Sequence, residues 1–255
     1  MKILLTGATG YIGKRLLPVL VENGHDVVCC ARDLNRFNIP QSLKLKVSAI
    51  EVDLSNITSL SKIPQDIEAA YYLVHSMAKK DYLNTELDCA VNFRKILAKT
   101  NIKHLIYLSG IVNEKTLSKH LISRRNVEQE LSSGKYNFTS IRSGIIIGSG
   151  SASFEIIRDL VEKLPIMVAP KWLLTRSQPI AISDVIKILN KTLNNSKTFN
   201  KNFDIGGPEI ISYKDILIRY SSLRGLQRRI FTVPVMTPKL SSYWLYFVTS
   251  TAYNL

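Results

Sequence analysis

The chain opens with the stretch that decides its fold, Gly7-Ala8-Thr9-Gly10-Tyr11-Ile12-Gly13. The apolar run Ile3-Leu4-Leu5 precedes it, and the apolar residues Leu16, Val19 and Leu20 after it lie on one face of a helix. This order of strand, glycine loop and helix is typical of a nucleotide-binding turn. Glycines let the backbone turn tightly and approach a ligand closely, and the start of the helix points free amide groups at a diphosphate. We therefore expect this loop to bind a dinucleotide.

Short apolar segments alternate with helical ones through the first part of the chain. Strands are expected at 27–31, 47–52, 70–74 and 105–108 and from about residue 138, with helices near 84–99 and 118–131. The alternation predicts a parallel sheet covered by helices on both faces, which is an α/β fold of the doubly wound Rossmann type. Ligands of such sheets bind outside the carboxyl ends of the strands, so we expect the site among the residues that follow the strands.

The C-terminal part of the chain has a different pattern. Residues 1–148 form the expected dinucleotide-binding core, whereas residues 149–255 carry amphipathic helical segments near 157–164 and 213–220. Ser212 and Asp215 have the spacing of a capping box before the second of these helices. A short strand at 203–205 predicts that the chain returns to the sheet. We expect residues 149–255 to complete the sheet and to form a small substrate lobe, in one structural unit with the core.

The chain is strongly basic, with a formal net charge of +14. The basic residues are scattered apart from a cluster at 224–229, and no zinc-finger or RNA-recognition consensus is present. This distribution favours a solvated basic surface and no specific nucleic-acid partner, with a nucleic acid, an acidic protein or a membrane surface as the alternative partners. The aromatic segment 243–248 is too short and too rich in hydroxyl groups to be a transmembrane segment.

The three cysteines, Cys29, Cys30 and Cys89, do not form a disulfide framework, because their number is odd and two are neighbours in an expected strand. Their spacing is not that of metal ligands. We interpret them as core thiols in a reducing compartment. The chain begins directly with an apolar strand, which leaves no room for a signal peptide, so we expect a cytoplasmic protein.

Arg32 ends the second expected strand, where the adenosine ribose of a bound dinucleotide would lie. A carboxylate at this place suits the 2′-hydroxyl of NAD, whereas an arginine suits the 2′-phosphate of NADP. The neighbouring residue is Asp33, and Arg36 adds a second cation nearby. We favour NADP as the cofactor, with NAD as the alternative and a surface role as the other interpretation of Arg32.

Motifs along nearly the whole chain are very similar to those of atypical short-chain dehydrogenase/reductases, within the NAD-dependent epimerase/dehydratase superfamily. The sequence resembles in particular their YbjT/NmrA-like family of NAD(P)H-binding proteins. The stretches that carry the resemblance are 6–13, 70–77, 106–110, 118–130, 144–154, 177–185 and 203–208. In many relatives with these motifs a further domain follows.

The resemblance implies a set of cofactor contacts. Asp53 would contact the adenine amino group and Leu54 would pack on the adenine ring, with a helix N-cap as the structural alternative for Asp53. The other implied cofactor-binding residues are Gly7, Thr9, Gly10, Tyr11, Ile12, Gly13, Arg32, Val74, His75, Ser109 and Arg124. A substrate pocket would include Trp172, Arg176 and Gln178, with a core position for Trp172 and a surface salt bridge for Arg176 as the structural alternatives.

The resemblance is weakest at the catalytic residues. Active members of the superfamily use a serine, a tyrosine that acts as the general acid, and a lysine four residues after the tyrosine. Ser109 takes the place of the serine, His120 that of the tyrosine and Arg124 that of the lysine. Histidine exchanges protons near pH 7, but arginine does not deprotonate in proteins and cannot relay a proton.

Two functions remain open on these residues. The favoured one is an NAD(P)-dependent oxidoreductase that acts on an unidentified small molecule with an unusual proton donor. The alternative is a non-catalytic NADP-sensing regulatory protein of NmrA type, which would bind the dinucleotide and act on a protein partner. A sugar-nucleotide epimerase or dehydratase is less favoured, because those reactions depend on the tyrosine that is absent here.

Overall fold

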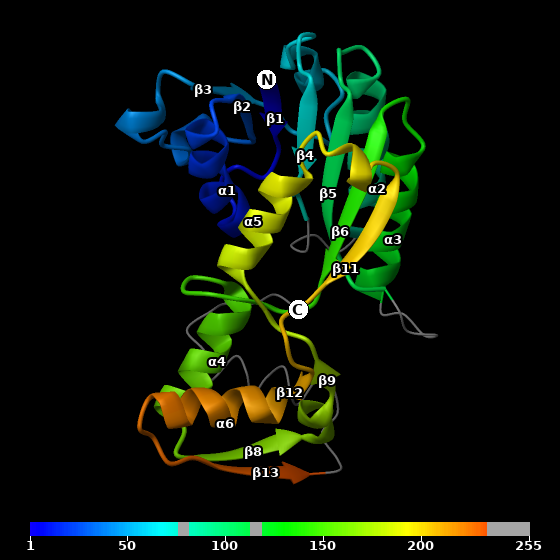
Figure 1. Ribbon diagram of the computed structural model, residues 1–255. Helices are drawn as coiled ribbons and strands as arrows, with labels where there is room; N and C mark the ends of the chain where they lie inside the picture. The colour runs from blue at the N-terminus through cyan, green and yellow to red at the C-terminus, as the bar shows by residue number, and fades with distance from the viewer. Residues whose placement is uncertain (76–81, 113–118, 234–255) are drawn as a thin grey trace. The chain divides into compact units, whose positions relative to one another are not determined.

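The computed structural model describes residues 1–75, 82–112 and 119–233 of the 255-residue chain. It divides into two compact units (Figure 1). The sheet unit consists of Met1–Ser143 and Ser183–Ile205, and the C-terminal unit consists of Gly144–Ile182 and the chain from Gly206 on. Each unit is described by itself below. The expected segment at 243–248 and residues 76, 77 and 118 of the expected motifs lie outside the described ranges.

The sheet unit is built on a seven-stranded sheet in which every neighbouring pair of strands is parallel. The strand order is β11-β6-β5-β4-β1-β2-β3. The strands are β1 (Lys2–Leu5), β2 (Asp26–Ala31), β3 (Val47–Glu51), β4 (Ala69–Tyr72), β5 (His104–Gly110), β6 (Asn137–Ser143) and β11 (Lys201–Ile205). This architecture confirms the predicted doubly wound α/β fold. The order reverses at β1, with β2 and β3 on one side and β4 to β6 on the other, which is where ligands bind in such sheets.

Helices cover both faces of this sheet. Successive residues of a strand point to opposite faces, so neighbouring side chains pack against different helices. Tyr72 packs with α2 (Tyr82–Leu97) and α3 (Lys119–Ser132) in one apolar core. Its neighbour Tyr71 points the other way and donates a hydrogen bond from its hydroxyl to the carbonyl of Leu189 in α5 (Ile182–Thr192), at 3.0 Å. Figure 1 shows α5 and α1 (Tyr11–Glu22) on the near side of the sheet, opposite α2 and α3.

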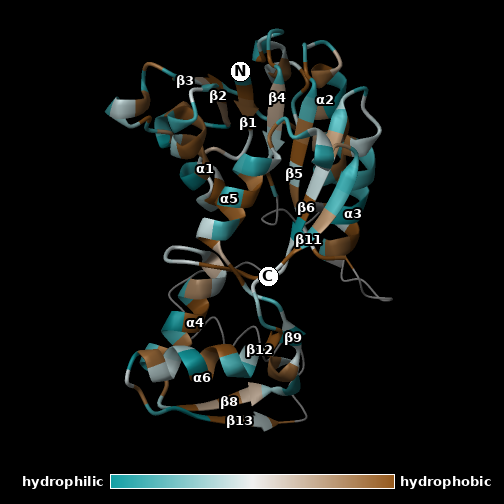
Figure 2. Cartoon of the chain, in the orientation of Figure 1, coloured by the Kyte–Doolittle hydropathy of each residue, from teal (hydrophilic) through white to brown (hydrophobic). Residues whose placement is uncertain are grey.

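Burial explains why the central strands are apolar along their whole length. Every residue of β4 is buried, as are all but the last of β5, and these strands lack the alternation of a half-exposed sheet. Figure 2 shows hydrophobic β1 and β5 in the centre and a more polar β11 at the edge. The thiols of Cys29, Cys30 and Cys89 are buried in this unit, as predicted.

The C-terminal unit packs two helices on a two-stranded parallel ribbon. The helices are α4 (Ala152–Lys163) and α6 (Tyr213–Leu223), and the ribbon pairs β8 (Ile166–Pro170) with β13 (Arg229–Val233). The predicted capping box begins α6: the Ser212 hydroxyl accepts from the amide of Asp215, and the Asp215 carboxylate accepts from the amide of Ser212, both at 3.0 Å.

Two further strand pairs and five short 3-10 helices complete the described elements. The pairs are β7 (Ile146–Ile147) with β10 (Ile180–Ala181) and β9 (Arg176–Ser177) with β12 (Ile211–Ser212). The 3-10 helices are η1 (Leu34–Arg36), η2 (Gln41–Leu43), η3 (Ser59–Lys62), η4 (Lys171–Leu174) and η5 (Ser196–Thr198). In the parts of the chain that are described, no helix combines the length and the apolar character that a membrane span requires.

Candidate dinucleotide-binding site

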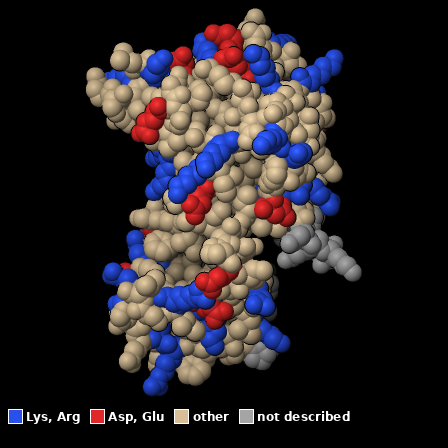
Figure 3. All heavy atoms as spheres, in the orientation of Figure 1, with Lys and Arg blue, Asp and Glu red and all other residues tan. Residues whose placement is uncertain are grey.

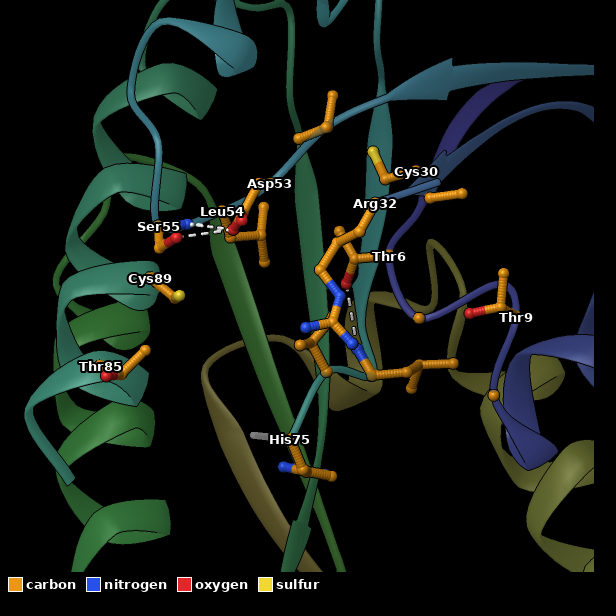
Figure 4. A pocket seen from close by; sticks show the side chains of 16 residues that line it. Thr6, Thr9, Cys30, Arg32, Asp53, Leu54, Ser55, His75, Thr85 and Cys89 are labelled. Carbon is orange, nitrogen blue, oxygen red and sulfur yellow. Dashed lines mark hydrogen bonds between the residues drawn. The ribbon is translucent and has the colours of Figure 1, made fainter. Parts of the chain in front are cut away.

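A cavity of about 310 Å³ lies in the sheet unit where the strand order reverses (Figure 4). Its wall comes from the last two residues of β2, from the residues that follow β1, β2, β3 and β4, and from two residues of α2. Eight of the predicted cofactor-binding residues line it: Gly7, Thr9, Gly10, Arg32, Asp53, Leu54, Val74 and His75. The fold therefore brings together residues that are far apart in the sequence, at the edge of the sheet where a ligand was expected.

A side chain at each of the three glycines of the loop would meet different surroundings. Gly7 has a φ of +71°, and a Cβ there would lie 2.7 Å from the carbonyl oxygen of Leu73. A Cβ on Gly13 would collide with the backbone of Gly7 and lie 2.8 Å from Cα of Ala8. A Cβ on Gly10 would meet only the carbonyl oxygen of Gly7, at 3.1 Å. The fold itself thus requires Gly7 and Gly13, whereas Gly10 faces the cavity and leaves space there.

The amino end of α1 begins at this loop without a capping side chain. Its N-cap is Gly10, in extended conformation, and its first turn holds no acidic residue. The first amides of a helix have no acceptor within the helix, so this end favours an anion. The predicted contacts of Tyr11 and Ile12 are at this helix start, although their side chains do not line the cavity. The Tyr11 ring instead lies under the guanidinium of Arg15, 3.8 Å from its carbon.

Arg32 and its acidic neighbour have different environments. Arg32 is exposed, lines the cavity and makes no ion pair with any residue in the described ranges, and Figure 4 shows its side chain extending into the cavity. Asp33 caps η1, where its carboxylate accepts from the amide of Asn35 at 2.9 Å. Asp33 is not part of the cavity wall. The cavity therefore presents a cation, and not this carboxylate, beside the end of β2.

Asp53 and Leu54 line the opposite side of the cavity. One oxygen of the Asp53 carboxylate accepts from the amide of Ser55 at 2.9 Å and from its hydroxyl at 2.7 Å, so this residue closes a turn (Figure 4). The alternative expectation of a helix N-cap at Asp53 was wrong, because the next helix, η3, has Thr58 as its N-cap. Leu54 is buried in the core beneath α2 and also contributes to the cavity wall. These contacts fix the turn that carries both residues.

A polar cluster adjoins the cavity at the end of β5. Arg124 of α3 donates from Nε to Nε2 of His120 and from Nη1 to Nε2 of His75, both at 3.1 Å. Its side chain lies over the end of β5, because a Cβ on Gly110 would be 3.4 Å from its Cδ. His75 lines the cavity, so this cluster of His75, His120 and Arg124 is continuous with the cavity wall.

Both histidines are held as neutral acceptors. Burial and the charge of Arg124 lower the pKa of His120, and the same two causes lower the pKa of His75 well below its usual range. His75 also has a hydrogen bond with the backbone at Leu108. While His120 accepts from Arg124, its Nε2 atom carries no proton to donate.

Two hydroxyl groups on β5 have no regular hydrogen bond. The hydroxyls of Ser109 and Tyr107 are buried and have no partner of normal geometry among the described residues. Sequence reasoning identified Ser109 but not Tyr107. The signal was available, because residues two apart on a strand point to the same face. Sequence reasoning also did not identify the buried pair next to them, in which the Ser123 hydroxyl donates to the Glu86 carboxylate.

The three predicted substrate residues lie in the C-terminal unit. Trp172 in η4 is 43% exposed, with its ring edge-to-face against Tyr213 at 5.8 Å. Arg176 is exposed at the start of β9 and makes no ion pair with a described residue. Gln178 is engaged internally, because its amide donates to the carbonyl of Gly207 at 2.5 Å. Trp172 and Arg176 therefore have accessible side chains, whereas Gln178 holds a turn.

Comparison with known proteins agrees with this fold. The sequence profile of the NAD dependent epimerase/dehydratase family matches residues 3–113, which include the glycine loop and the first five strands. UDP-glucuronic acid 4-epimerase from Bacillus cereus, solved in complex with NAD, superposes with a TM-score of 0.73 at 22% identity, over 99% of this chain and 92% of that one. A nucleoside-diphosphate-sugar epimerase from Staphylococcus aureus superposes with a TM-score of 0.77 at 17% identity, over 100% and 93% of the two chains. The chain thus shares the fold of these structures, a Rossmann-type doubly wound sheet.

A sequence relative that is named as a reductase is considerably longer than this chain. Divinyl chlorophyllide a 8-vinyl-reductase of Arabidopsis thaliana is 22% identical over 226 residues, or 82% of this chain. The matched region is 54% of that reductase, so this chain spans about half the length of that relative.

Proposed function

We propose that this chain binds NADP(H) in the cavity of the sheet unit and serves as an NAD(P)-dependent oxidoreductase on a small molecule. The observation that carries the choice of cofactor is Arg32, a cation without an ion-pair partner among the described residues, in the wall of a glycine-loop cavity. NAD is the cofactor named in the structure of the Bacillus cereus epimerase. The exposed arginine, with Asp33 engaged in a cap, favours the 2′-phosphate of NADP.

The residues present fit a dinucleotide along the cavity. The open side of Gly10 and the uncapped start of α1 would receive the pyrophosphate, with Thr9 beside them. Leu54 and Asp53 would bind the adenine, and Arg32 the 2′-phosphate. Val74 and His75 continue the wall towards Ser109 and Arg124, where the nicotinamide end would lie.

The cofactor supplies hydride chemistry when it is bound, and the protein residues orient the reactants. Arg124 keeps its charge at every physiological pH and has three N–H groups beyond the two given to His75 and His120, so it is suited to hold the nicotinamide ribose. Ser109 would orient the oxygen of the substrate. The proton-donor role predicted for His120 would require it to release Arg124 first.

The second candidate function is a non-catalytic NADP sensor of NmrA type. The specific observation in its favour is that His120, in the place of the usual tyrosine, accepts a hydrogen bond from Arg124 and has a lowered pKa. Such a protein would bind the dinucleotide without turnover and act through a protein partner or a further domain.

For the chain as a whole we infer a dinucleotide-binding core in residues 1–148, with residues 149–255 completing the sheet and forming a small substrate lobe. The accessible side chains of Trp172 and Arg176 support a substrate role for that lobe. A cytoplasmic location and kinship with the YbjT/NmrA-like family belong to the same proposal.

Calorimetric titration with NADPH and NADH, followed by a turnover screen with carbonyl and quinone compounds, tests this function. We expect tighter binding of NADPH than of NADH. If neither NADPH nor NADH binds, the proposal is contradicted. Binding without any turnover would favour the sensor.

A further inference from the structure

Three buried hydroxyl groups in the described part of the chain have no hydrogen bond of regular geometry, and two of them, on Tyr107 and Ser109, are two residues apart on β5. Tyr107 is completely buried and Ser109 is 2% exposed. A buried polar group without a partner is uncommon and costs free energy, and it often marks a place where a ligand or water completes the site. The two hydroxyls at this strand end are therefore available to a third group.

The surroundings of the pair connect it to the cavity. Tyr107 lies on the same face of β5 as Ser109, its ring centre is 6.3 Å from that of His75, and His75 lines the cavity. Arg124 lies over the residue after Ser109, and its charge acts on the Tyr107 hydroxyl. A phenol, a hydroxyl and a fixed cation thus lie close to His75, the residue of the cavity wall near which the nicotinamide is proposed to lie.

The other ionisable groups that face this position are already engaged. His75 and His120 both accept from Arg124, Glu86 accepts from the Ser123 hydroxyl, and Glu128 accepts from Arg142. Of these side chains, the two hydroxyls of β5 are the ones without a hydrogen bond of regular geometry.

We propose that Tyr107 and Ser109 together supply the proton for a carbonyl or quinone oxygen, in place of the missing helix tyrosine; this proposal rests on the proposed NAD(P)H-dependent function. Hydride, which the reduced dinucleotide supplies, adds to the carbonyl carbon and turns its oxygen into an alkoxide. The Ser109 hydroxyl gives its proton to that oxygen and takes one from the Tyr107 hydroxyl. The phenolate that remains lies near the Arg124 guanidinium and regains a proton from solvent. The net reaction consumes one carbonyl group, one hydride and one proton.

The acidity of the phenol fits this role. Burial raises the pKa of Tyr107 to about 12, although the charge of Arg124 and the Ser109 hydroxyl act in the opposite direction. The phenol therefore stays protonated across the neutral range and gives up its proton only to a much stronger base such as an alkoxide. Tyr107 acts through Ser109, so it is a positioning residue in this scheme.

The first test compares Tyr107→Phe with Tyr72→Phe, because each removes one hydroxyl from a buried ring of the same core and the two rings are 5.8 Å apart. The probe reaction is reduction of phenanthrenequinone by NADPH. We expect Tyr107→Phe to lower turnover by roughly 10²–10⁴-fold with unchanged affinity for NADPH, the usual effect of a positioned acid. Wild-type turnover should stay level between about pH 6 and about pH 9, because the phenol remains protonated there. Tyr72→Phe should retain its turnover.

The second test needs neither cofactor nor substrate. Fluorotyrosine placed at position 107 reports ionisation of the phenol by fluorine NMR, and we expect its pKa to rise in both Ser109→Ala and Arg124→Gln. An unchanged pKa of the fluorotyrosine in both variants would overturn the proposal. Full turnover of Tyr107→Phe would also overturn it, as would a wild-type protein that binds NADPH but reduces no quinone. Failure of the wild type to bind NADPH would instead contradict the proposed function, and the fluorine titration would still test whether the hydroxyls and Arg124 are coupled.

Discussion

The guanidinium of Arg124 donates to Nε2 of His75 at 3.1 Å, which joins α3 to the wall of the dinucleotide cavity. The same guanidinium donates to Nε2 of His120, so one cation holds two neutral imidazoles. A protonated imidazole at either position would place an N–H group against the arginine. This relationship disfavours a histidine as the acid and directs attention to the hydroxyls at the end of β5.

Substitutions at two glycines of the loop should have different effects, one on ligand binding and the other on the stability of the fold. Gly10→Val should abolish binding of NADPH and NADH, because the side chain would occupy the space of the pyrophosphate, while the melting temperature changes little. Gly10 has a φ of −79°, which other residues adopt readily. Gly13→Ala is the matched control: its Cβ would strike the backbone of Gly7, so it should lower the free energy of unfolding by roughly 1–3 kcal/mol. Retained binding by Gly10→Val would show that the ligand lies elsewhere.

His104 should make the sheet unit sensitive to acid. It is fully buried, with Nε2 bonded to the Thr139 hydroxyl at 2.9 Å and Nδ1 accepting from the amide of Asn194 at 3.1 Å. Burial lowers its pKa from 6.5 to about 4. The unfolded chain therefore binds this proton more readily, so the contribution to stability is complete above about pH 6.5, falls as the pH drops from there to about 4, and levels off below.

The size of this loss is up to about 3 kcal/mol, from the difference between the two pKa values. Urea unfolding at pH 7, 5 and 4 measures it, with His104→Gln as the reference that lacks the titrating group. Parallel pH dependence of the two proteins would show that protonation of His104 does not control stability.

An internal ion pair should stabilise the packing of α3 on β6. Arg142 of β6 pairs with the buried carboxylate of Glu128 in α3 through two of its nitrogens, and the Ser140 hydroxyl donates to the same carboxylate at 2.7 Å. In Glu128→Gln, the one carboxylate of the described residues that still pairs with the partly buried Arg142 is that of Asp204, at 3.9 Å. We expect the free energy of unfolding to fall by about 3 kcal/mol, measured by urea denaturation. A change no larger than that of the exposed pair variant Asp26→Asn would contradict this role.

The basic surface should not bind nucleic acid specifically. Lys and Arg are spread over the drawn face among acidic residues (Figure 3), without a single basic stripe. Binding of duplex DNA or RNA, measured by fluorescence anisotropy, should be independent of sequence and should disappear near physiological salt. A sequence-dependent complex that persists at that salt would contradict this expectation.

Much of the fold was predictable, because the buried strands have to be continuous apolar runs and the glycine loop has to follow the first of them. The cavity wall was predictable for the same reason: the residues after parallel strands meet at one edge, so Gly7, Arg32, Asp53 and His75 had to be close together. The cap made by Asp33 was not foreseen, because its choice between a ligand and the amide of Asn35 depends on local backbone geometry.

The hydrogen bonds between distant elements were not predictable in the same way. Arg124 and His75 are 49 residues apart, and only the packing of α3 against the end of β5 decides which nitrogen faces which. Tyr107 looked like an ordinary apolar strand residue, since its hydroxyl becomes informative only once its missing partner is seen.

The central claim, that the cavity binds NADP(H) through Arg32, is tested most directly by calorimetric titration of Arg32→Ala with NADPH and NADH. We expect NADPH binding to weaken by roughly 10- to 150-fold, which corresponds to about 1.5–3 kcal/mol for a hydrogen bond to a charged group, and NADH binding to change little. Arg36→Ala is the matched control, because Arg36 is an exposed arginine nearby that does not line the cavity, and it should retain wild-type affinity for both dinucleotides. Equal losses for NADPH and NADH in Arg32→Ala, or no loss for either, would contradict the claim.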